Sequence, residues 1–508
     1  MSERLTFGYG TSGHLGNTPV PTGSAVTPSE EHPPAPKEHP PAPKEHPPAV
    51  QRRSRAATVA DRPDGAFIGL MLFTALLFLR PQDSLPALGA LHLAELSAIG
   101  ALIAMTAGRL GRGLSVSRIT PELVGVVLMG VLILATAPFS IWPGGAVGTF
   151  TDIYSKIILI FLLMVNTLTS RKRIEQFVWL IVIASGYIAF RAVLDYGRGI
   201  NLIENGRVQG SVGGMFKNPN DLALNMVAVM PLAASLAFRA AGVFARIGGA
   251  LCAVMMVGAI VASQSRSGTI GLVVMAFVMG MYLVRKKPAV AGAAALALFL
   301  ALPLLPSSYW YRLSSITDET QDQTGSREAR RTLLRESFDA FLQHPLTGVG
   351  AGQFKNYDPD GREQPWRESH NIVLQVGAEL GILGVCALLF LMTRGGLAGV
   401  RVRRLLRQAR GVRPRSRPGT GASPEMAARP AAMSAQEAEW FEGHAAAMTA
   451  ALVGWFFCAL FASVAYNWTF YYLLALAVIP ADILEQRFLP RRRRSLLARA
   501  GGLQEARA

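Results

Sequence analysis

Three cationic side chains and one histidine occupy positions where they could bind a phosphate group and move a proton. Arg266 lies between serines, and Arg207 and Lys217 lie in a loop-like segment ahead of an apolar run. A guanidinium presents a planar fork of N–H donors that meets phosphate oxygens in pairs, and a lysine adds a point charge. His370 directly precedes another apolar run, where its imidazole could accept a proton from a hydroxyl near neutral pH.

Three of these residues also have a simpler structural explanation. Arg266 could be an interfacial residue that extends its charge to the membrane surface, and Arg207 could be an ordinary loop arginine. His370 could cap a helix or fill an interface. Position alone leaves Arg207 and His370 open, whereas the small polar neighbours of Arg266 favour a functional role.

Other short patterns predict structure. Asn220 and Asp221 are expected to cap the helix that starts beside them. Close helix packing is the first explanation for three glycines at helical spacing, Gly377, Gly381 and Gly384. The sequence has no nucleotide-binding loop, no cluster of metal ligands and no acidic pair typical of metal-dependent sugar transferases. We therefore expect no cofactor and no metal.

The composition requires a membrane. Of the 508 residues, 51% are hydrophobic and 16% are charged, which is more apolar material than one soluble core can bury. The formal net charge of +17 could suit nucleic acid, but Lys and Arg fall in short runs between apolar stretches. This arrangement is typical of membrane topology, so we expect membrane lipids and no nucleic acid as partners.

Apolar runs recur from residue 66 onward, each long enough to cross or nearly cross a hydrocarbon core of roughly 30 Å. They predict an all-α fold, a polytopic bundle of about twelve transmembrane helices. The expected helices cover 66–80, 86–107, 121–142, 154–169, 174–193, 219–239, 244–264, 268–285, 288–306, 371–395, 444–465 and 467–485.

The remaining segments complete the organisation of the chain. Residues 1–62 are rich in proline, contain a repeated heptapeptide and are expected to be a disordered cytoplasmic leader. The further regions are 66–306 with the first nine transmembrane helices, 307–370 as a long periplasmic loop, 371–395 as the tenth helix, 396–443 as a basic, low-complexity cytoplasmic loop, 444–485 with the last two helices, and 486–508 as a basic cytoplasmic tail.

Basic residues decide the expected orientation. They follow every even-numbered helix, as at 171–173 and 285–287. Because loops rich in Lys and Arg stay on the cytoplasmic side, both termini are expected in the cytoplasm. The loops 194–218 and 307–370 then lie outside it.

The long loop is expected to be partly helical. Ser326 can cap a helix that ends at Pro345. Its apolar stripe consists of Leu333, Leu334, Phe338, Phe341 and Leu342. Two explanations stay open: the helix lies on the outer membrane face or over a cavity, or the stripe packs against the bundle.

The residues around His370 form a longer pattern. The chain reads HPLTGVGAGQF from His344, and later HN, nine residues and GILG from His370. This order resembles the signature of the O-antigen ligase and Wzy-type polymerase superfamily, and the resemblance extends over most of the membrane portion. The segments RVQGS from Arg207 and SQSRSG from Ser263 lie where that family has arginines implicated, with the histidine, in transfer from a polyprenyl diphosphate.

The resemblance implies a metal-independent, inverting glycosyltransferase of the bacterial inner membrane. It would move a glycan from undecaprenyl diphosphate to an acceptor hydroxyl on the periplasmic face. His370, Arg266 and Arg207 would be catalytic, with His370 as the base, and Lys217, Arg207 and Arg266 would bind the donor. The family contains ligases, which attach a glycan to lipid A core in lipopolysaccharide biosynthesis, and polymerases, which extend surface polysaccharide. The sequence does not separate the two, and the ligase comes first because the signature is usually described for it.

A flippase for lipid-linked oligosaccharides is the alternative from another class, since about twelve helices is a common transporter count. A transporter of two halves would have its long cytoplasmic link after the sixth helix. Here that link is the short turn 239–246, and the long segments follow the ninth and tenth helices. This spacing favours the transferase.

Overall fold

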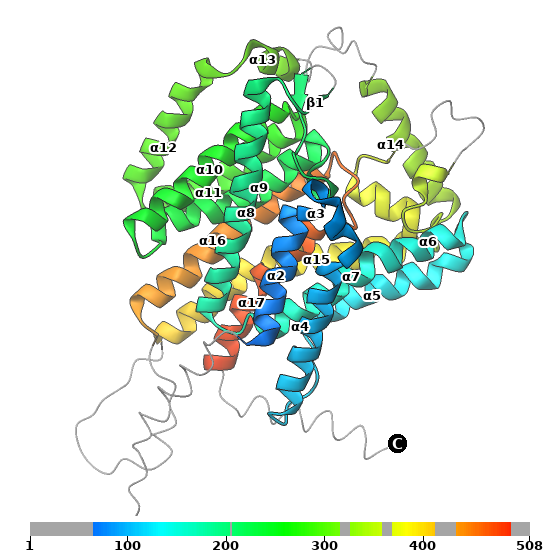
Figure 1. Ribbon diagram of the computed structural model, residues 1–508, viewed down its shortest axis with the longest axis horizontal. Helices are drawn as coiled ribbons and strands as arrows, with labels where there is room; N and C mark the ends of the chain where they lie inside the picture. Colours follow the sequence, from blue (N-terminus) through cyan, green and yellow to red (C-terminus); the bar gives the residue numbers. More distant parts are fainter. Residues whose placement is uncertain (1–63, 204–205, 315–325, 358–367, 412–432, 489–508) are drawn as a thin grey trace, which may run out of the picture. The chain divides into compact units, whose positions relative to one another are not determined.

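The computed structural model describes residues 64–203, 206–314, 326–357, 368–411 and 433–488. All of them belong to the unit that spans residues 57–508. Helices dominate these ranges, and two strands of two residues each form a small antiparallel sheet. The expected fold class, an all-α polytopic bundle, is confirmed (Figure 1).

Helices occupy all of the stretches that were expected to be helical. In chain order they are α2 (Gly65–Leu79), η1 with α4 (Pro86–Leu91 and Leu93–Leu110), α5 (Pro121–Thr136), α7 (Ser155–Thr167), α8 (Arg171–Arg198), α9 (Pro219–Arg239), α10 (Val243–Ser263), α11 (Arg266–Lys286), α12 (Pro288–Ala301), α15 (Ile372–Gly411), α16 (Ala435–Ala459) and α17 (Trp468–Phe488). Within the described ranges, nine helical segments are long and apolar enough to cross a membrane, and α2 and α12 are shorter apolar helices. A count of twelve crossings stays a prediction.

Shorter elements lie between these helices. They are α3 (Pro81–Ser84), α6 (Pro143–Thr149), the π-helix η3 (Phe150–Tyr154), β1 (Leu202–Ile203), β2 (Arg207–Val208), η5 (Gly214–Phe216), α13 (Ser307–Ser314), α14 (Ser326–Gln343) and η8 (Phe354–Asn356). Because α6 and η3 run into α7, the helix expected from residue 154 starts at Pro143 instead, and proline fits the first position of a helix.

The cytoplasmic loop expected at 396–443 is helical at both margins. α15 continues to Gly411, and Arg401 on this extension binds Glu485 of α17 at 2.7 Å. α16 begins at Ala435, where the Ser434 side chain caps it by accepting the N–H of Glu437. An apolar run alone marks only part of each helix, because polar turns that bind neighbouring helices carry no hydropathy signal. The leader 1–62, the middle of this loop and most of the tail lie outside the described residues.

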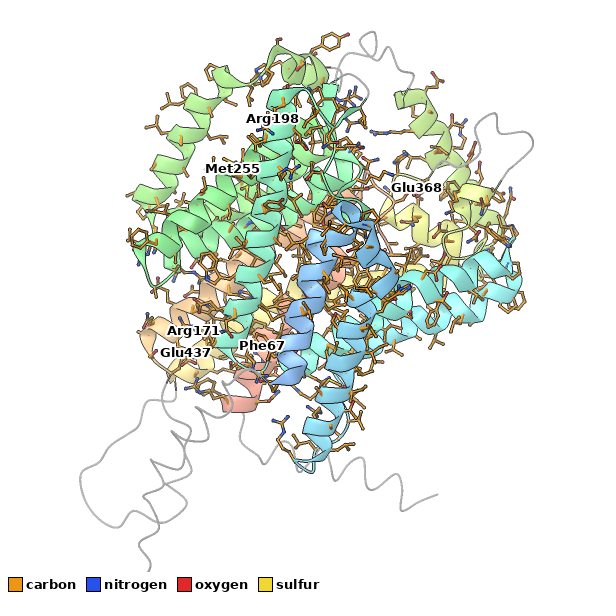
Figure 2. All side chains as sticks on the ribbon, in the orientation of Figure 1. Phe67, Arg171, Arg198, Met255, Glu368 and Glu437 are labelled. Atoms are coloured by element: carbon orange, nitrogen blue, oxygen red, sulfur yellow. The ribbon has the colours of Figure 1, made fainter. Side chains whose placement is uncertain are left out.

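The bundle has two chemically different ends. Ion pairs join helix termini at the end we call the basic end: Arg173–Asp64, Lys286–Glu442, Arg401–Glu485 and Arg487–Glu437. The opposite end, which we call the motif end, carries β2, the start of α11 and the start of α15, and thus Arg207, Arg266 and His370. Figure 2 shows Arg171 and Glu437 near each other at the basic end, away from Glu368.

α9 and α17 form the centre of the bundle. Both bury most of their residues, α9 packs against α10, α11 and α16, and α17 packs against α15 and α16. Small residues allow the close contacts: Gly271 of α11 lies against Cys458 and Gly454 of α16. The helices that carry the candidate site are therefore fixed by the core.

Gly381 breaks α15 near its start. Its backbone is left-handed, with φ 65° and ψ −163°, and a Cβ there would lie 2.6 Å from the carbonyl oxygen of Pro345. The break leaves the carbonyls of Ala378 and Glu379 without helical donors. The N–H groups of Val349 and Gly350 bind them at 2.8 and 3.0 Å, which satisfies polar backbone that cannot be left bare in a membrane protein. Close packing was the expected role of this glycine, and the structure adds a helix break.

The glycine-rich loop is in turn anchored at the two ends of α6, by Ser140 ahead of the helix and by Thr149 at its last position. Ser140 donates from its hydroxyl to the carbonyl of Val349 at 3.0 Å, and the Thr149 hydroxyl donates to the carbonyl of Ala351 at 3.0 Å. A Cβ on Gly350 would lie 1.9 Å from the Ser140 hydroxyl oxygen, so no larger residue fits. The glycines of the motif thus stabilise the segment of α15 that follows His370.

Candidate functional site

Arg207 is held on β2 at the motif end. Its side chain is buried, with 7% of the residue exposed. Nε donates to the carbonyl of Ser263 at 3.2 Å, and Nη2 donates to Oδ1 of Asn220 at 2.7 Å. A loop arginine without a role would be solvated, so this geometry favours the functional reading of Arg207.

Asn220 is a junction, not a helix cap. The cap of α9 is Asn218, whose Oδ1 accepts the N–H of Asn220 at 2.8 Å, so the expected capping by Asn220 is wrong. Oδ1 of Asn220 accepts from Arg207 and also from the Ser265 hydroxyl at 2.9 Å. One amide oxygen therefore joins β2, the start of α9 and the turn between α10 and α11.

Arg266 opens α11 next to this junction. Ser265 caps the helix by accepting the N–H of Gly268, and Gln264 has a left-handed backbone that turns the chain sharply. Nε of Arg266 donates to the carbonyl of Arg312 at 3.3 Å. Since Arg207 binds Ser263, two residues before Ser265, the structure brings the segments of both predicted arginines together.

A third arginine belongs to the same place. Arg312 of α13 donates from Nε to the carbonyl of Gln264 at 2.9 Å. α13 is fixed there by a second bond, between the hydroxyls of Tyr309 and Thr269 at 2.9 Å. The sequence analysis missed Arg312. Its signal was an arginine beside the exposed Trp310, in an aromatic cluster typical of a membrane interface.

His370 is placed by its neighbours. Its backbone is left-handed, with φ 50°, and its N–H donates to the hydroxyl of Ser463 at 3.0 Å. The imidazole is half-buried. Asn371 caps α15 by accepting the N–H groups of Val373 and Leu374, so a capping role for His370 is excluded.

Glu368 adds a carboxyl two residues before His370. Its carboxyl is electrostatically coupled to Asp221, which follows Asn220 on α9. Burial raises the pKa of Glu368, against the opposing effects of the Lys355 charge and a hydrogen bond from Ser463. By accessible surface the residue is nevertheless exposed, so this carboxyl is within reach of water.

Glu368 and Ser463 were also missed by the sequence analysis. Glu368 is part of the motif ESHN, so its acidic character beside His370 was the available signal. Ser463 lies 93 positions from His370, and no local pattern relates them. Only the tertiary fold brings Ser463 next to His370.

Lys217 lies near the arginines without joining them. It is exposed, one residue before the cap of α9, and only its backbone N–H is bonded, to Gly214. Among the described residues its ammonium has no hydrogen bond or ion pair. A role in donor binding stays a prediction for this residue.

α14 packs against α15 with one face. Leu333, Ser337 and Ala340 are buried, and Phe341 lies against Gly377. Phe338 is 48% exposed, and Leu342 of the same stripe is 58% exposed. Packing on the bundle therefore explains part of the stripe, while its exposed edge remains available to a membrane surface. A roof over the site stays a prediction.

Within the part of the chain that the structure describes, no group of three His, Cys, Asp or Glu residues is placed to hold a metal ion. The positive charge of the site comes from Arg207, Arg266 and Arg312. Such a cluster can bind a polyanion, and the half-buried His370 can accept a proton.

Comparison with known proteins gives a family match over part of the chain. Residues 251–399, from α10 to the middle of α15, match the family model described as O-antigen ligase, Wzy_C. The match confirms the resemblance to the O-antigen ligase and Wzy-type superfamily and indicates a multi-pass membrane enzyme of glycosyltransferase-like type. A search of the curated proteins finds no match. The matched range includes Arg266, Arg312, Glu368 and His370 but not Arg207.

Proposed function

We propose that the protein transfers a glycan from undecaprenyl diphosphate to an acceptor hydroxyl, as an O-antigen ligase does. The proposal places it in the bacterial inner membrane with lipid A core as the acceptor. The family match supports this class of enzyme, and the cluster of arginines supports an anionic leaving group. The observation that carries the proposal is the Asn220 junction, which holds Arg207 beside the start of α11.

The arginines bind the diphosphate of the donor in this proposal. Arg207 is buried and held by two bonds, so its guanidinium is already oriented before the substrate arrives. Arg266 and Arg312 add two further charges, and Lys217 would contribute a fourth from the loop. Guanidinium groups can neutralise the departing diphosphate, so the proposed reaction uses no metal.

His370 accepts the proton of the acceptor hydroxyl. The hydroxyl oxygen forms a bond to the anomeric carbon while the bond from that carbon to the diphosphate oxygen breaks, and the electron pair leaves with the diphosphate. In-line attack inverts the anomeric centre. The Glu368 carboxylate, two residues away, would stabilise the imidazolium that forms.

The orientation follows from the basic end. Four basic residues lie there, at or near helix ends: Arg173, Lys286, Arg401 and Arg487. Basic residues that flank membrane-spanning helices favour the cytoplasmic side. The motif end would then face the periplasm, together with α13 and α14.

A reconstituted transfer assay tests the proposal. The purified protein is mixed with an undecaprenyl-diphosphate-linked glycan and lipid A core, and the product is separated by size. Transfer by the wild type, lost in Arg207→Ala, Arg266→Ala and His370→Ala, is the expected result. Arg285→Ala, at the basic end, is the matched control and should stay active. No transfer under any condition would refute the proposal.

The same assay decides between the two activities of the family. A product linked to lipid A core marks a ligase, whereas a ladder of longer glycans on undecaprenyl diphosphate marks a polymerase. Movement of the lipid-linked glycan across a vesicle membrane without transfer would instead identify a flippase.

A further inference from the structure

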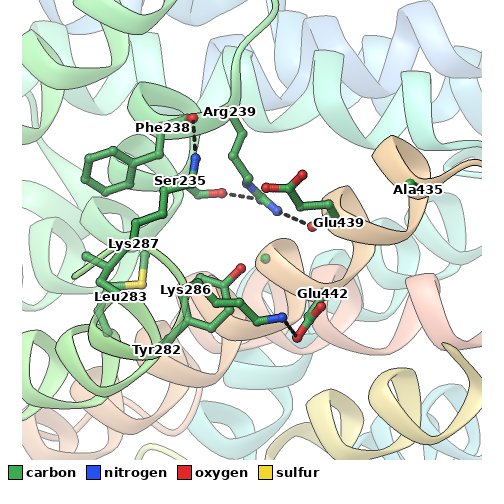
Figure 3. A pocket seen from close by; sticks show the side chains of 12 residues that line it. Ser235, Phe238, Arg239, Tyr282, Leu283, Lys286, Lys287, Ala435, Glu439 and Glu442 are labelled. Atoms are coloured by element: carbon green, nitrogen blue, oxygen red, sulfur yellow. Dashed lines mark hydrogen bonds and ion pairs between the residues drawn. The ribbon is translucent and has the colours of Figure 1, made fainter. Parts of the chain in front are cut away.

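A cavity of about 280 Å³ lies at the basic end, away from the site described above. The last turns of α9 and α11 and the first turns of α16 enclose it (Figure 3). A buried water needs roughly 10–15 Å³ of such space, so the cavity has room for a much larger molecule.

Arg239 extends into this cavity, and only part of its hydrogen-bond donors are used by the fold. Its Nη1 donates to the carbonyls of Glu439 and Trp440 at 3.0 and 2.8 Å, and its Nη2 donates to the Ser235 hydroxyl. A guanidinium has five N–H groups. Among the described residues, no acceptor is found for the other two. A Cβ at Gly443 would lie 1.8 Å from Nη1, so the glycine leaves the space that the guanidinium occupies.

Two lysines complete the mouth of the cavity. Lys286 is paired with Glu442 at 2.9 Å, which neutralises both. Lys287 makes a single bond, from Nζ to the carbonyl of Phe238 at 3.4 Å, and so retains most of its hydrogen-bonding capacity. Arg239 and Lys287 together outweigh the one remaining carboxylate, Glu439.

The inner wall of the cavity is apolar. Phe238, Met279 and Leu283 line it next to the cationic groups. A free inorganic ion would use only the polar half of such a site. A lipid presents a charged headgroup with apolar atoms directly attached, and basic pockets between transmembrane helices are known to bind lipid phosphates.

We propose that this cavity binds the phosphate of a membrane phospholipid headgroup. Arg239 and Lys287 contact the phosphate oxygens, and the glycerol and first acyl carbons lie on the apolar wall. The lipid comes from the leaflet at the basic end. This site is independent of the proposed transfer reaction.

The bound lipid would link the helices that also build the motif end. α9 starts beside Asn220, α11 starts at Arg266, and α16 ends beside Leu460, whose carbonyl accepts from Asn371 at 3.1 Å. A headgroup bound to Arg239 and Lys287 contacts the far ends of α9 and α11, and Arg239 in turn binds the first turns of α16, so the spacing of the three helices is restrained. Occupancy should therefore raise the thermal stability of the whole bundle.

Lipid titration of the full-length, delipidated protein in detergent tests the proposal. The probes are dioleoyl-phosphatidylglycerol and, separately, sodium phosphate, with thermal unfolding and native mass spectrometry as readouts. We expect the lipid to raise Tm in a saturable way and to form a one-to-one complex. Lys287→Gln should weaken the apparent affinity at least tenfold, because this side chain has only one weak bond in the fold.

Arg285→Gln is the matched control. Arg285 is an exposed neighbour of Lys287 that does not line the cavity. The Arg285→Gln substitution removes the same charge, and the lipid affinity of this variant should equal that of the wild type. Equal weakening in Arg285→Gln and Lys287→Gln would mean diffuse surface attraction and would overturn the site. Absence of saturable binding in the wild type would overturn it as well. Stabilisation by sodium phosphate alone, lost in Lys287→Gln, would support the phosphate contacts and reject a lipid source.

Discussion

Asn220→Ala separates the geometry of the arginine site from its charge. The substitution keeps Arg207 and Arg266 but removes the oxygen that accepts from Arg207 at 2.7 Å and from Ser265 at 2.9 Å. A hydrogen bond to a charged group contributes roughly 1.5–3 kcal/mol and a neutral one about 1 kcal/mol. If about 2–4 kcal/mol of stabilisation is lost in the transition state, transfer slows roughly 30- to 700-fold, because about 1.4 kcal/mol corresponds to a factor of ten.

Asn218→Ala is the matched control. It removes the cap of α9, two residues earlier, at a cost of about 1 kcal/mol in stability, but it leaves the Arg207 bond intact. Initial rates of glycan transfer, normalised to folded protein by size exclusion, should fall steeply in Asn220→Ala and little in Asn218→Ala. Asn220→Ala within threefold of the wild type would refute the role assigned to the junction. Equal losses in both variants would show that the helix start matters and the arginine contact does not.

Three further predictions concern other parts of the molecule. In a protein without native cysteines, a membrane-impermeant thiol reagent added outside cells should label Asp339→Cys on α14 but not Gln408→Cys on α15, and the reverse labelling would invert the topology. Burial raises the pKa of the Glu368 carboxyl above its ordinary value of 4.5, so the folded state binds more protons than the unfolded state and becomes less stable as pH rises above 4.5. Glu368→Gln should therefore raise Tm at about pH 7 and have little effect at about pH 4. Gly381→Ala should cost more than about 2 kcal/mol, whereas Gly396→Ala, with open space around it, should gain about 0.5–1 kcal/mol, and chemical denaturation measures both.

Local sequence patterns were sufficient to predict the helix bundle but not the contacts between its helices and loops. Hydropathy placed each of the long apolar helices, because lipid requires long apolar runs. The cap of α9 could also have been found, since a proline at the first helical position makes the preceding Asn218 the cap. Asn220 was misassigned because a short polar side chain near a helix start suits a cap, and only the fold reveals that Arg207 needs it.

The rest of the site depends on distant segments. Ser463 meets His370 across loops that no spacing rule relates. Arg312 reaches the site because α13 folds back on the turn between α10 and α11. A polar group buried in a membrane bundle without a hydrogen-bond partner costs free energy, so the fold favours these pairs. This cost arises only in the folded chain, where the groups are buried.

The glycines of the family signature and the cationic groups of the proposed site are different residues. Gly348, Gly350 and Gly381 let the loop bind the broken backbone of α15, a role that any substrate would leave unchanged. Arg207, which lies outside the matched range, is a buried cation of the site that binds Ser263 and Asn220. A match to the glycine pattern therefore predicts the scaffold, and the presence of a buried arginine on β2 with an acceptor on α9 is the stronger test of whether a related chain can hold a diphosphate.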